Sequence, residues 1–273
     1  MSVHPKSRFP RSSFSATVTT LRRAGCVFAE DEASLLHEAA GSPDHLASLV
    51  GRRAAGLPLE HVLGWAEFCD RRFAVDSGVF VPRRRTEFLV AQAAALAPRR
   101  AVVVDLCCGS GALGLALAAA ADAAELHACD VEPAAVRCAR RNVGALGQVY
   151  EGDLFGPLPA GLRGRVDVLL ANVPYVPTDD VELLPAEARV HEPRVALDGG
   201  GDGLDVMRRV AAEAPAWLAP GGSLLVETSE RQRDTAVDVL RAAGLSIRVL
   251  VSDELYATVL VGTAGAGTAG KVT

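Results

Sequence analysis

The sequence predicts an α/β protein whose doubly wound, mostly parallel sheet ends in an antiparallel last strand. Three observations support this fold class. Apolar strands alternate with helical segments from residue 101 onward, the first strand runs into a glycine-rich turn at Gly109–Gly111, and a pair of strand-like runs closes the chain. A strand, a glycine turn and a helix in this order are typical of a nucleotide-type cofactor site at the carboxyl edge of a parallel sheet.

Length and composition limit the class of protein. The 273 residues suffice for one large domain or two modest ones, and the formal charge of −5 does not favour binding to polyanions. No uninterrupted apolar run reaches the roughly 18–20 residues that a membrane span needs. The six cysteines are scattered without the paired spacing of a metal site. This pattern predicts a reduced, cytoplasmic enzyme without a bound metal.

The two ends of the chain differ in composition from its middle. Residues 1–15 are rich in Ser, Pro and Arg and contain no apolar segment, so we interpret them as a disordered leader, with a transit peptide as the alternative. Residues 16–60 have a helical spacing of apolar side chains, broken at Gly41–Pro43, and predict a small helical subdomain. Residues 263–273 are predicted to form a flexible tail.

A hairpin and linker are predicted for residues 61–84. Phe68 and Phe73–Val75 flank a polar stretch, as in a β-hairpin. Val79–Val81 is predicted to be a short strand that a proline ends. The basic run Arg83–Arg85 has two interpretations, contact with an acidic partner or a solvated linker, and we favour the linker.

The main domain is predicted to span residues 85–262, with polar side chains after several of its apolar runs. Ligands of parallel sheets bind at these strand ends. The predicted strands are Ala101–Val104, Leu126–Cys129, Val149–Tyr150, Val166–Ala171, Ser223–Glu227, Ile247–Val251 and Ala257–Val261. Helices are predicted after Gly111 and over Thr86–Leu96, Pro133–Asn142, Val206–Ala214 and Thr235–Ala243.

The glycine turn is the first candidate site. Gly109, Gly111 and Gly114 match the pattern G-x-G-x-x-G, which alone is a weak signal. Asp105 stands just before the turn. A carboxylate there would repel a pyrophosphate, but it would suit the sulfonium and ammonium groups of S-adenosylmethionine. The alternative is a turn that only lets the helix pack against the strand.

Acids also follow the next two strands. Asp130 closes the second strand, where a carboxylate accepts hydrogen bonds from ribose hydroxyls. Because NAD and S-adenosylmethionine both carry that ribose, Asp130 does not separate them, and a helix N-cap is its alternative role. Asp153 ends the third strand and would meet the exocyclic amine of adenine, with Leu154 packing on the ring.

The tetrad Asn172-Val173-Pro174-Tyr175 follows the fourth strand and indicates the reaction. An amide nitrogen is a poor nucleophile because its lone pair is delocalised. An Asn side-chain carbonyl and a backbone carbonyl can accept both of its N–H bonds, which fixes the nitrogen and raises its electron density. Tyr175 can stack on the planar amide, and Pro174 stiffens the loop. These features predict methyl transfer to nitrogen.

Together these motifs resemble the HemK-type protein-(glutamine-N5) methyltransferases, which modify peptide chain release factors. The resemblance extends from about Pro58 to Gly262. It rests on P-L-E-H-V-L-G, V-P-R-R-R-T-E, D-L-C-C-G-S-G, G-D-L-F, N-V-P-Y and, from Glu192 to Asp205, E-P-R-V-A-L-D-G-G-G-D-G-L-D. It implies a Rossmann-like, seven-stranded class I fold and S-adenosylmethionine as cofactor. It further implies a release factor or related translation protein as substrate, a monomer, and no stable binding to nucleic acid or membrane.

The resemblance also implies roles for single residues, with Asp130 at the cofactor's ribose and the helical part and hairpin seating the protein substrate. The residues expected to bind the cofactor are Asp105, Cys107, Cys108, Gly109, Ser110, Gly111, Asp130, Asp153, Leu154 and Asn172. The residues expected to bind the substrate are Asn172, Val173, Pro174 and Tyr175, and catalysis is expected from Asn172, Pro174 and Tyr175.

Three departures from the family pattern are typical of a divergent paralogue. Val173 stands where the tetrad usually has a second proline, and Cys107 stands where the approach to the turn commonly has a glycine. The stretch V-P-R-R-R-T-E replaces the commoner P-R-P-E-T-E, which removes an acid and a proline near the exit of the hairpin.

Two other function classes remain open on the residues alone. A methyltransferase of adenine or cytosine amino groups shares the N-x-P-Y tetrad, but it predicts a basic groove that the negative net charge does not favour. A cofactor-binding module without activity is not favoured by the intact tetrad. We interpret Cys107-Cys108, His61 and His191 as structural or surface residues rather than redox or metal groups.

Overall fold

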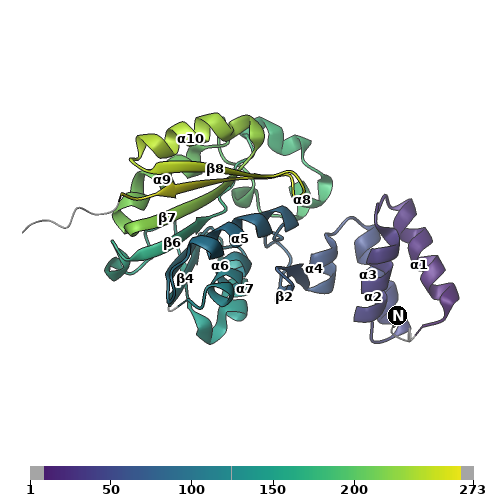
Figure 1. Ribbon diagram of the computed structural model, residues 1–273. Coiled ribbons are helices and arrows are strands. Elements are labelled where there is room, and N and C mark those ends of the chain that lie inside the picture. The colour runs from purple at the N-terminus through teal and green to yellow at the C-terminus, as the bar shows by residue number, and fades with distance from the viewer. Residues whose placement is uncertain (1–8, 124, 266–273) are drawn as a thin grey trace, which may run out of the picture.

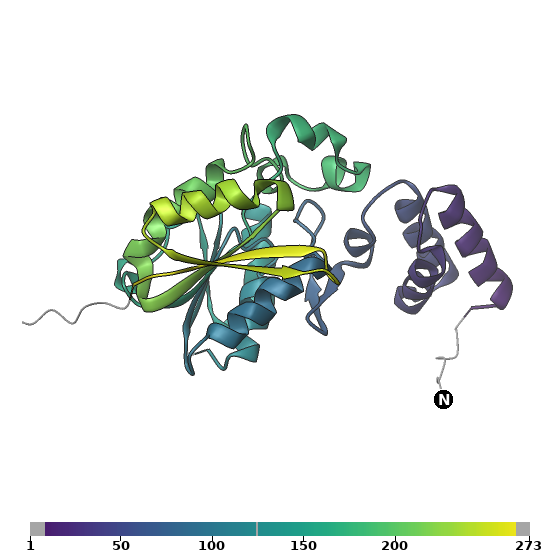
Figure 2. The same ribbon diagram turned by 45° about the horizontal axis from the view of Figure 1, so that its top comes forward.

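The computed structural model describes residues 9–123 and 125–265, which form a helical unit, a β-hairpin and an α/β domain (Figure 1). The helical unit stands to one side of the α/β domain, with the hairpin between them, in both views (Figure 2). Within the described ranges, no helix has the length and apolar character to cross a membrane.

The N-terminal unit consists of α1 (Arg11–Arg23), α2 (Ala29–Ala39), α3 (Pro43–Ala54) and α4 (Leu59–Leu63). These helices pack around a core that includes the fully buried Leu21 and Leu36. Ser42 caps α3 because its hydroxyl accepts a hydrogen bond from the backbone N–H of His45. The predicted disordered leader of residues 1–15 is too long, because α1 already begins at Arg11. Residues 1–8 of the predicted leader lie outside the described chain.

The central sheet has the strand order β5-β4-β3-β6-β7-β9-β8. β9 lies between β7 and β8 and is antiparallel to both, whereas the other neighbours are parallel. The prediction of a mostly parallel, seven-stranded sheet with an antiparallel last strand is therefore confirmed. The strands are β3 (Val102–Leu106), β4 (Glu125–Asp130), β5 (Gln148–Glu151), β6 (Val166–Ala171), β7 (Leu218–Thr228), β8 (Ser246–Ser252) and β9 (Ala257–Thr263).

Helices cover both faces of this sheet, with α5, α6 and α7 on one face and α9 and α10 on the other (Figure 1). These helices are α5 (Glu87–Leu96), α6 (Ala112–Ala120), α7 (Pro133–Val143), α9 (Asp205–Trp217) and α10 (Arg233–Ala242). The long section before α9, predicted as irregular, contains the short helix α8 (Ala186–His191) and two 3₁₀ segments, Thr178–Leu183 and Arg194–Ala196. Residues of this section line a cavity together with residues at the carboxyl ends of the strands.

The hairpin pairs β1 (Trp65–Phe68) with β2 (Arg71–Ala74), as the sequence predicts. Cys69 and Asp70 form its turn with positive φ angles of 49° and 57°, as a two-residue hairpin turn requires. Both phenylalanines of the hairpin are buried against the core under α5 and α6. The hairpin is therefore anchored on the α/β domain rather than on the N-terminal helices.

The predicted strand Val79–Val81 is wrong, because this segment has no sheet partner in the described part of the chain. Side chains satisfy its backbone groups instead. His61 Nε2 donates to the carbonyl of Val79 at 2.8 Å, and the N–H of Val81 donates to Glu192 Oε1 at 3.1 Å. The apolar side chains that suggested a strand pack in a small cluster with the hairpin and α7. His61 therefore has a structural role, as predicted.

The pleat of β3 sorts its side chains between two cores. Val103 belongs to the core under α5 and α6, and Val104 belongs to the core under α9. Asp105 follows Val103 onto the α6 face, where its Oδ2 accepts the N–H of Gly114 at 2.8 Å. The approach is so close that a Cβ on Gly114 would lie 2.9 Å from that oxygen. Gly114 therefore serves the packing of helix on strand.

We expect Gly114→Ala to lower the free energy of unfolding by about 1–3 kcal/mol, because the added methyl group overpacks the contact with Asp105. Gly51, inside α3, is the matched control, since a Cβ there would meet nothing within 4 Å. Gly51→Ala should raise the free energy of unfolding by about 0.5–1 kcal/mol. Urea unfolding of both variants tests the expectation, and equal effects of the two substitutions would contradict it.

Candidate active site

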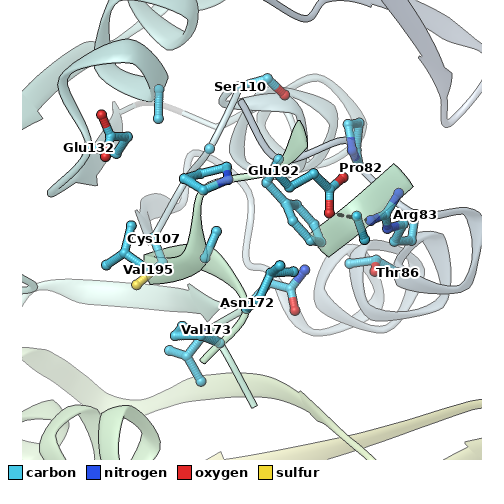
Figure 3. A pocket seen from close by; sticks show the side chains of 18 of the residues that line it. Pro82, Arg83, Thr86, Cys107, Ser110, Glu132, Asn172, Val173, Glu192 and Val195 are labelled. Carbon is cyan, nitrogen blue, oxygen red and sulfur yellow. Dashed lines mark hydrogen bonds and ion pairs between the residues drawn. The ribbon is translucent and has the colours of Figure 1, made fainter. Parts of the chain in front are cut away.

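A cavity of about 440 Å³ opens at the carboxyl ends of the central strands (Figure 3). Its walls come from the glycine turn after β3, the end of β4, the tetrad after β6, the loop before α5 and the section around α8. A volume of this size suits a small-molecule cofactor. The lining includes Cys107, Gly109, Asp130, Asn172, Tyr175 and Glu192.

The glycine turn is held by Asp130. Asp130 Oδ2 accepts the N–H of Gly109 at 2.8 Å, and its Oδ1 accepts the N–H of Glu132 at 2.9 Å. Burial raises the pKa of the Asp130 carboxyl. Each carboxylate oxygen has a second acceptor site, so Asp130 can still accept hydrogen bonds from a ligand in the cavity. Asp130 thus fixes the turn relative to β4 and keeps capacity for hydroxyl groups.

Backbone conformation explains part of the turn's composition. Gly109 and Gly111 have φ angles of 54° and 76°, which favour glycine. Cys107 has a φ of 54° as well, although it is not a glycine. This left-handed conformation is costly for a residue with a Cβ. A glycine at this position, the commoner residue in the resembled family, would avoid that strain.

Asp105 does not line the cavity, which corrects its predicted contact with the cofactor. It lies beneath the turn against α6, and only 1% of its surface is exposed. Its Oδ1 has no hydrogen-bond partner among the described residues. Burial raises the pKa of Asp105 to about 7. The position of Asp105 therefore indicates a structural role in helix packing.

Asp153, Leu154 and Gly111 are also absent from the cavity wall. Asp153 is largely exposed and forms an ion pair with Arg209 on α9. Leu154 packs in the core under α9, and its carbonyl accepts a hydrogen bond from Cys129 Sγ at 2.9 Å. The residues predicted to contact adenine, Asp153 and Leu154, and the predicted cofactor-binding residue Gly111 thus lie outside the cavity wall. By contrast, Cys107, Cys108, Gly109, Ser110, Asp130 and Asn172 do line it.

The tetrad Asn172–Tyr175 after β6 forms one corner of the cavity. The half-buried Asn172 side chain makes no hydrogen bond with the described residues and lies toward the Thr86 side of the cavity (Figure 3). The side chain of Val173 points away from the cavity into the core. The Val173 carbonyl likewise has no hydrogen-bonded donor in the described chain. The corner therefore offers two free carbonyl acceptors.

The section between α8 and α9 holds this corner from behind. The N–H of Val176 donates to the carbonyl of Leu197 at 3.0 Å, and the N–H of Gly199 donates back to the carbonyl of Val176 at 2.8 Å. A Cβ on Gly199 would lie 2.7 Å from the Pro174 carbonyl oxygen, and one on Gly203 would lie 2.3 Å from that of Tyr175. The glycines of this section are needed because its backbone touches the tetrad.

Glu227, at the end of β7, binds three partners at the far side of the cavity. Its Oε1 accepts from Arg85 Nε at 2.8 Å and from the Tyr175 hydroxyl at 3.0 Å, and its Oε2 accepts from the Thr86 hydroxyl at 2.7 Å. Arg85 Nη2 also donates to the Tyr175 oxygen at 2.5 Å. Burial and the Glu227 charge raise the pKa of Tyr175. We call Arg85, Thr86, Tyr175 and Glu227 the Glu227 clamp.

The basic run before α5 is therefore not a solvated linker, which corrects our preferred interpretation. Arg83 pairs at 2.5 Å with the buried Glu192, as Figure 3 shows, and Arg85 pairs with Glu227. Burial raises the pKa of the Glu192 carboxyl. Glu227 and Glu192 were not predicted as site residues. The signal for Glu227 was its place at the carboxyl end of a central strand.

An ion-pair network joins the N-terminal helices to the lip of the cavity. The buried Arg53 on α3 pairs at 2.6 Å both with Glu32 on α2 and with Glu187 on α8. Glu187 itself lines the cavity. The helical unit thus contacts the section that covers the site. The described residues contain no cluster of side chains suited to a metal ion.

Comparison with known proteins gives consistent matches. A methyltransferase small domain matches residues 70–209. The chain is 41% identical over 209 residues to a release factor glutamine methyltransferase of Geobacter sulfurreducens, covering 74% of this chain and 72% of that protein. It is 38% identical over 255 residues to the protein so named in Mycolicibacterium smegmatis, covering 86% and 89%.

Solved structures share the fold at low sequence identity. A methyltransferase from Pyrococcus furiosus has a TM-score of 0.51 at 15% identity, over 66% of this chain and 82% of its own. A 16S rRNA methyltransferase of T. thermophilus in complex with AdoMet and guanosine has a TM-score of 0.53 at 21% identity, over 73% and 49%. These likenesses confirm the predicted class I methyltransferase fold.

The position of Asp105 predicts a specific dependence of stability on pH. Its pKa is about 7 in the folded protein but about 3.9 in an unfolded chain. Between these values the unfolded state loses the proton while the folded state keeps it, so the free energy of unfolding falls as the pH rises from 4 to 7. Asp105→Asn removes this titration and can still accept the N–H of Gly114.

We therefore expect the free energy of unfolding of Asp105→Asn to fall less between pH 4 and pH 7 than that of the unchanged protein, by on the order of 3 kcal/mol. Asp130 and Glu192 also have raised pKa values, so the comparison is between the two proteins at each pH. Urea unfolding at several pH values measures it. Parallel pH profiles would show that Asp105 is ionised in the folded protein.

Proposed function

The chain belongs to the release factor glutamine methyltransferase family, and we propose that its cavity transfers a methyl group from S-adenosylmethionine to the side-chain amide of a glutamine in a peptide chain release factor. The chain is an S-adenosylmethionine-dependent methyltransferase. The observation that carries the proposed site is the Asn172 carboxamide, which lacks a partner in the described chain and stands in the same cavity as the glycine turn and Asp130.

The residues of the cavity fit the cofactor. Asp130 has free acceptor sites for ribose hydroxyls, and Gly109 leaves its Cβ position open, with the nearest atom, the Phe80 carbonyl oxygen, 3.9 Å away. Cys107 and Cys108 give the cavity a wall of small, uncharged side chains, because burial raises the pKa of both thiols. When bound, S-adenosylmethionine supplies an activated methyl group on a positively charged sulfur.

The residues of the tetrad would orient the acceptor nitrogen. Asn172 Oδ1 and the Val173 carbonyl would each accept one N–H of the glutamine amide. As the nitrogen gains positive charge in the transition state, both hydrogen bonds strengthen, so they lower the barrier rather than only bind the substrate. Val173, in place of the usual proline, still has a backbone carbonyl, and its side chain, buried in the core, holds this part of the loop in position.

The Glu227 clamp supports the same arrangement from the other side. It holds the Tyr175 hydroxyl between Arg85 and Glu227, so the ring has one defined position beside the acceptor. A fixed aromatic wall orients a planar amide and excludes water from the nitrogen. We further propose that the protein acts as a monomer, as the resemblance to the family implies, and that it works in the cytoplasm, where its six free cysteines stay reduced.

The substrate clamp is tested by Asn172→Ala. We expect kcat to fall by about 10²–10³-fold, on the scale of a lost oxyanion-hole donor, because the acceptor of the amide N–H is gone. The Kd for S-adenosylmethionine should stay within a few-fold. Mass spectrometry of the methylated glutamine and isothermal titration with the cofactor give the two values. Near-normal turnover would contradict the role of the tetrad.

Asp130→Ala is the complementary variant. We expect the Kd for S-adenosylmethionine to rise at least about tenfold, because the ribose loses an acceptor and Gly109 loses its partner. Isothermal titration measures this, and near-UV circular dichroism checks that the domain remains folded. An unchanged Kd would remove Asp130 from the cofactor site while leaving the tetrad's role intact.

A further inference from the structure

We propose that a second hollow beside the cavity binds the stretch of polypeptide that flanks the acceptor glutamine. This inference rests on the proposed function. The hollow has a volume of about 430 Å³ and lies at the end of β7 and the turn between β8 and β9. Its lining includes Thr228, Ser229, Arg233, Val251, Asp253 and Tyr256. None of these residues lines the first cavity.

The two hollows share a wall made of three of the four residues of the Glu227 clamp, since Thr86 lines only the first cavity. Arg85, Tyr175 and Glu227 line both. If a glutamine side chain reaches Asn172 in the first cavity, its backbone must stay outside, at the rim of that wall. An extended chain advances about 3.3–3.6 Å per residue. A flanking residue that leaves the first cavity across this shared wall would therefore reach the second hollow within one or two residues of the glutamine.

Arg85 offers free donors at this shared wall. A guanidinium has five N–H donors. In Arg85, Nε donates to Glu227 and Nη2 donates to Tyr175, whereas Nη1 has no partner among the described residues. The side chain is 45% exposed. Backbone carbonyl oxygens of a polypeptide leaving the first cavity would find these donors, and the charge of Arg85 is already balanced by Glu227.

Thr228 supplies the second independent sign of a ligand. It lines the hollow and is only 4% exposed, yet its Oγ1 has no hydrogen-bond partner in the described chain. A buried hydroxyl without a partner is unfavourable, because most buried polar groups in folded proteins form at least one hydrogen bond. A backbone N–H or carbonyl of a bound polypeptide would satisfy it.

The rim of the hollow indicates the character of the bound segment. Tyr256 is 90% exposed and is held in a left-handed turn with a φ of 50°, so an aromatic ring stands free at the edge. Glu230 and Asp253 are exposed and have no ion-pair partner in the described part of the chain, whereas Arg233 pairs with Asp234. The rim is therefore negative in balance, which favours a segment without acidic residues.

The test compares two probes with tritiated S-adenosylmethionine. The first is N-acetyl-glutamine methylamide, which can fill only the first cavity. The second is a nine-residue release-factor peptide with the same glutamine at its centre, which can reach both hollows. The measured quantity is the ratio of kcat/KM for the peptide to kcat/KM for the small probe. A variant that acts only on the first cavity changes both values and leaves the ratio as it was.

Thr228→Val is the decisive variant. It removes the hydroxyl and keeps the shape, so the ratio should fall about tenfold if that hydroxyl binds the peptide. The Tm should stay the same or rise, because an unpaired buried hydroxyl is lost. If the threonine had only a structural role, the ratio would not fall while the Tm stayed the same or rose. Thr263→Val is the matched control on β9, since its hydroxyl contacts Ser223 and lies outside the hollow.

Tyr256→Ala tests the rim and cannot disturb the core, because the ring is exposed. The ratio should fall about fivefold, on the scale of a truncated interface aromatic. Leu146→Ala, at another exposed apolar position, is the control. The charge of the rim is tested with two peptides. A peptide with Lys beside the glutamine should have a higher kcat/KM than a peptide with Glu at that position. In the double variant Glu230→Gln, Asp253→Asn, the difference between these two kcat/KM values should be smaller.

The outcomes separate the two proposals. If glutamine is methylated but the ratio is unchanged in Thr228→Val and Tyr256→Ala, the hollow does not bind the flanking polypeptide, and the proposed function stands. If the ratio falls in both variants and not in their controls, the hollow is the binding site. If the unchanged protein methylates neither probe nor an intact release factor, the proposed function fails, and the inference about the hollow fails with it.

Discussion

Glu227 is a carboxylate buried at the end of a central strand, and its need for partners determines the substrate side of the site. A buried charge is tolerated only when it is paired and hydrogen-bonded. Arg85, Thr86 and Tyr175 meet that need. Because these partners come from the start of α5 and from the loop after β6, one carboxylate draws three separate segments into a single wall. Both hollows use this wall, so the same interaction links the acceptor position with the proposed binding of the flanking polypeptide.

On the cofactor side, the corresponding constraint is a set of backbone contacts around the glycine turn. Asp130 holds Gly109, while Asn142 on α7 accepts the N–H of Ala74 at 2.9 Å and donates to the carbonyl of Ser110 at 2.8 Å. The turn is thereby tied to β4, to the hairpin and to a helix. A rigid turn keeps its small residues and free acceptors in place before any ligand arrives, which reduces the entropy lost on binding.

The section between β6 and α9 joins these two sides to the N-terminal helices. Its glycines let its backbone touch the tetrad, its Glu192 anchors the loop before α5, and its Glu187 pairs with Arg53 on α3. In the sequence this section shows no regular periodicity, yet it contacts the loop before α5 and the N-terminal helices, and it lines the same cavity as the glycine turn. Its glycines are explained by the close approach of its backbone to the tetrad, and its glutamates by their ion pairs with Arg53 and Arg83.

The sequence alone determined what depends on local order: the alternation of strands and helices, the positions of the glycine turn and of Asn172 at strand ends, and the hairpin around Phe68 and Phe73. Only the tertiary structure decided which groups meet. Arg83 and Arg85 find their carboxylates 109 and 142 positions away, and the pleat turns Asp105 under α6 instead of toward the cavity. Periodicity shows which side chains share one face of a strand, but only the assembled sheet decides what that face packs against. Ion pairs between distant segments leave no signature in the local sequence.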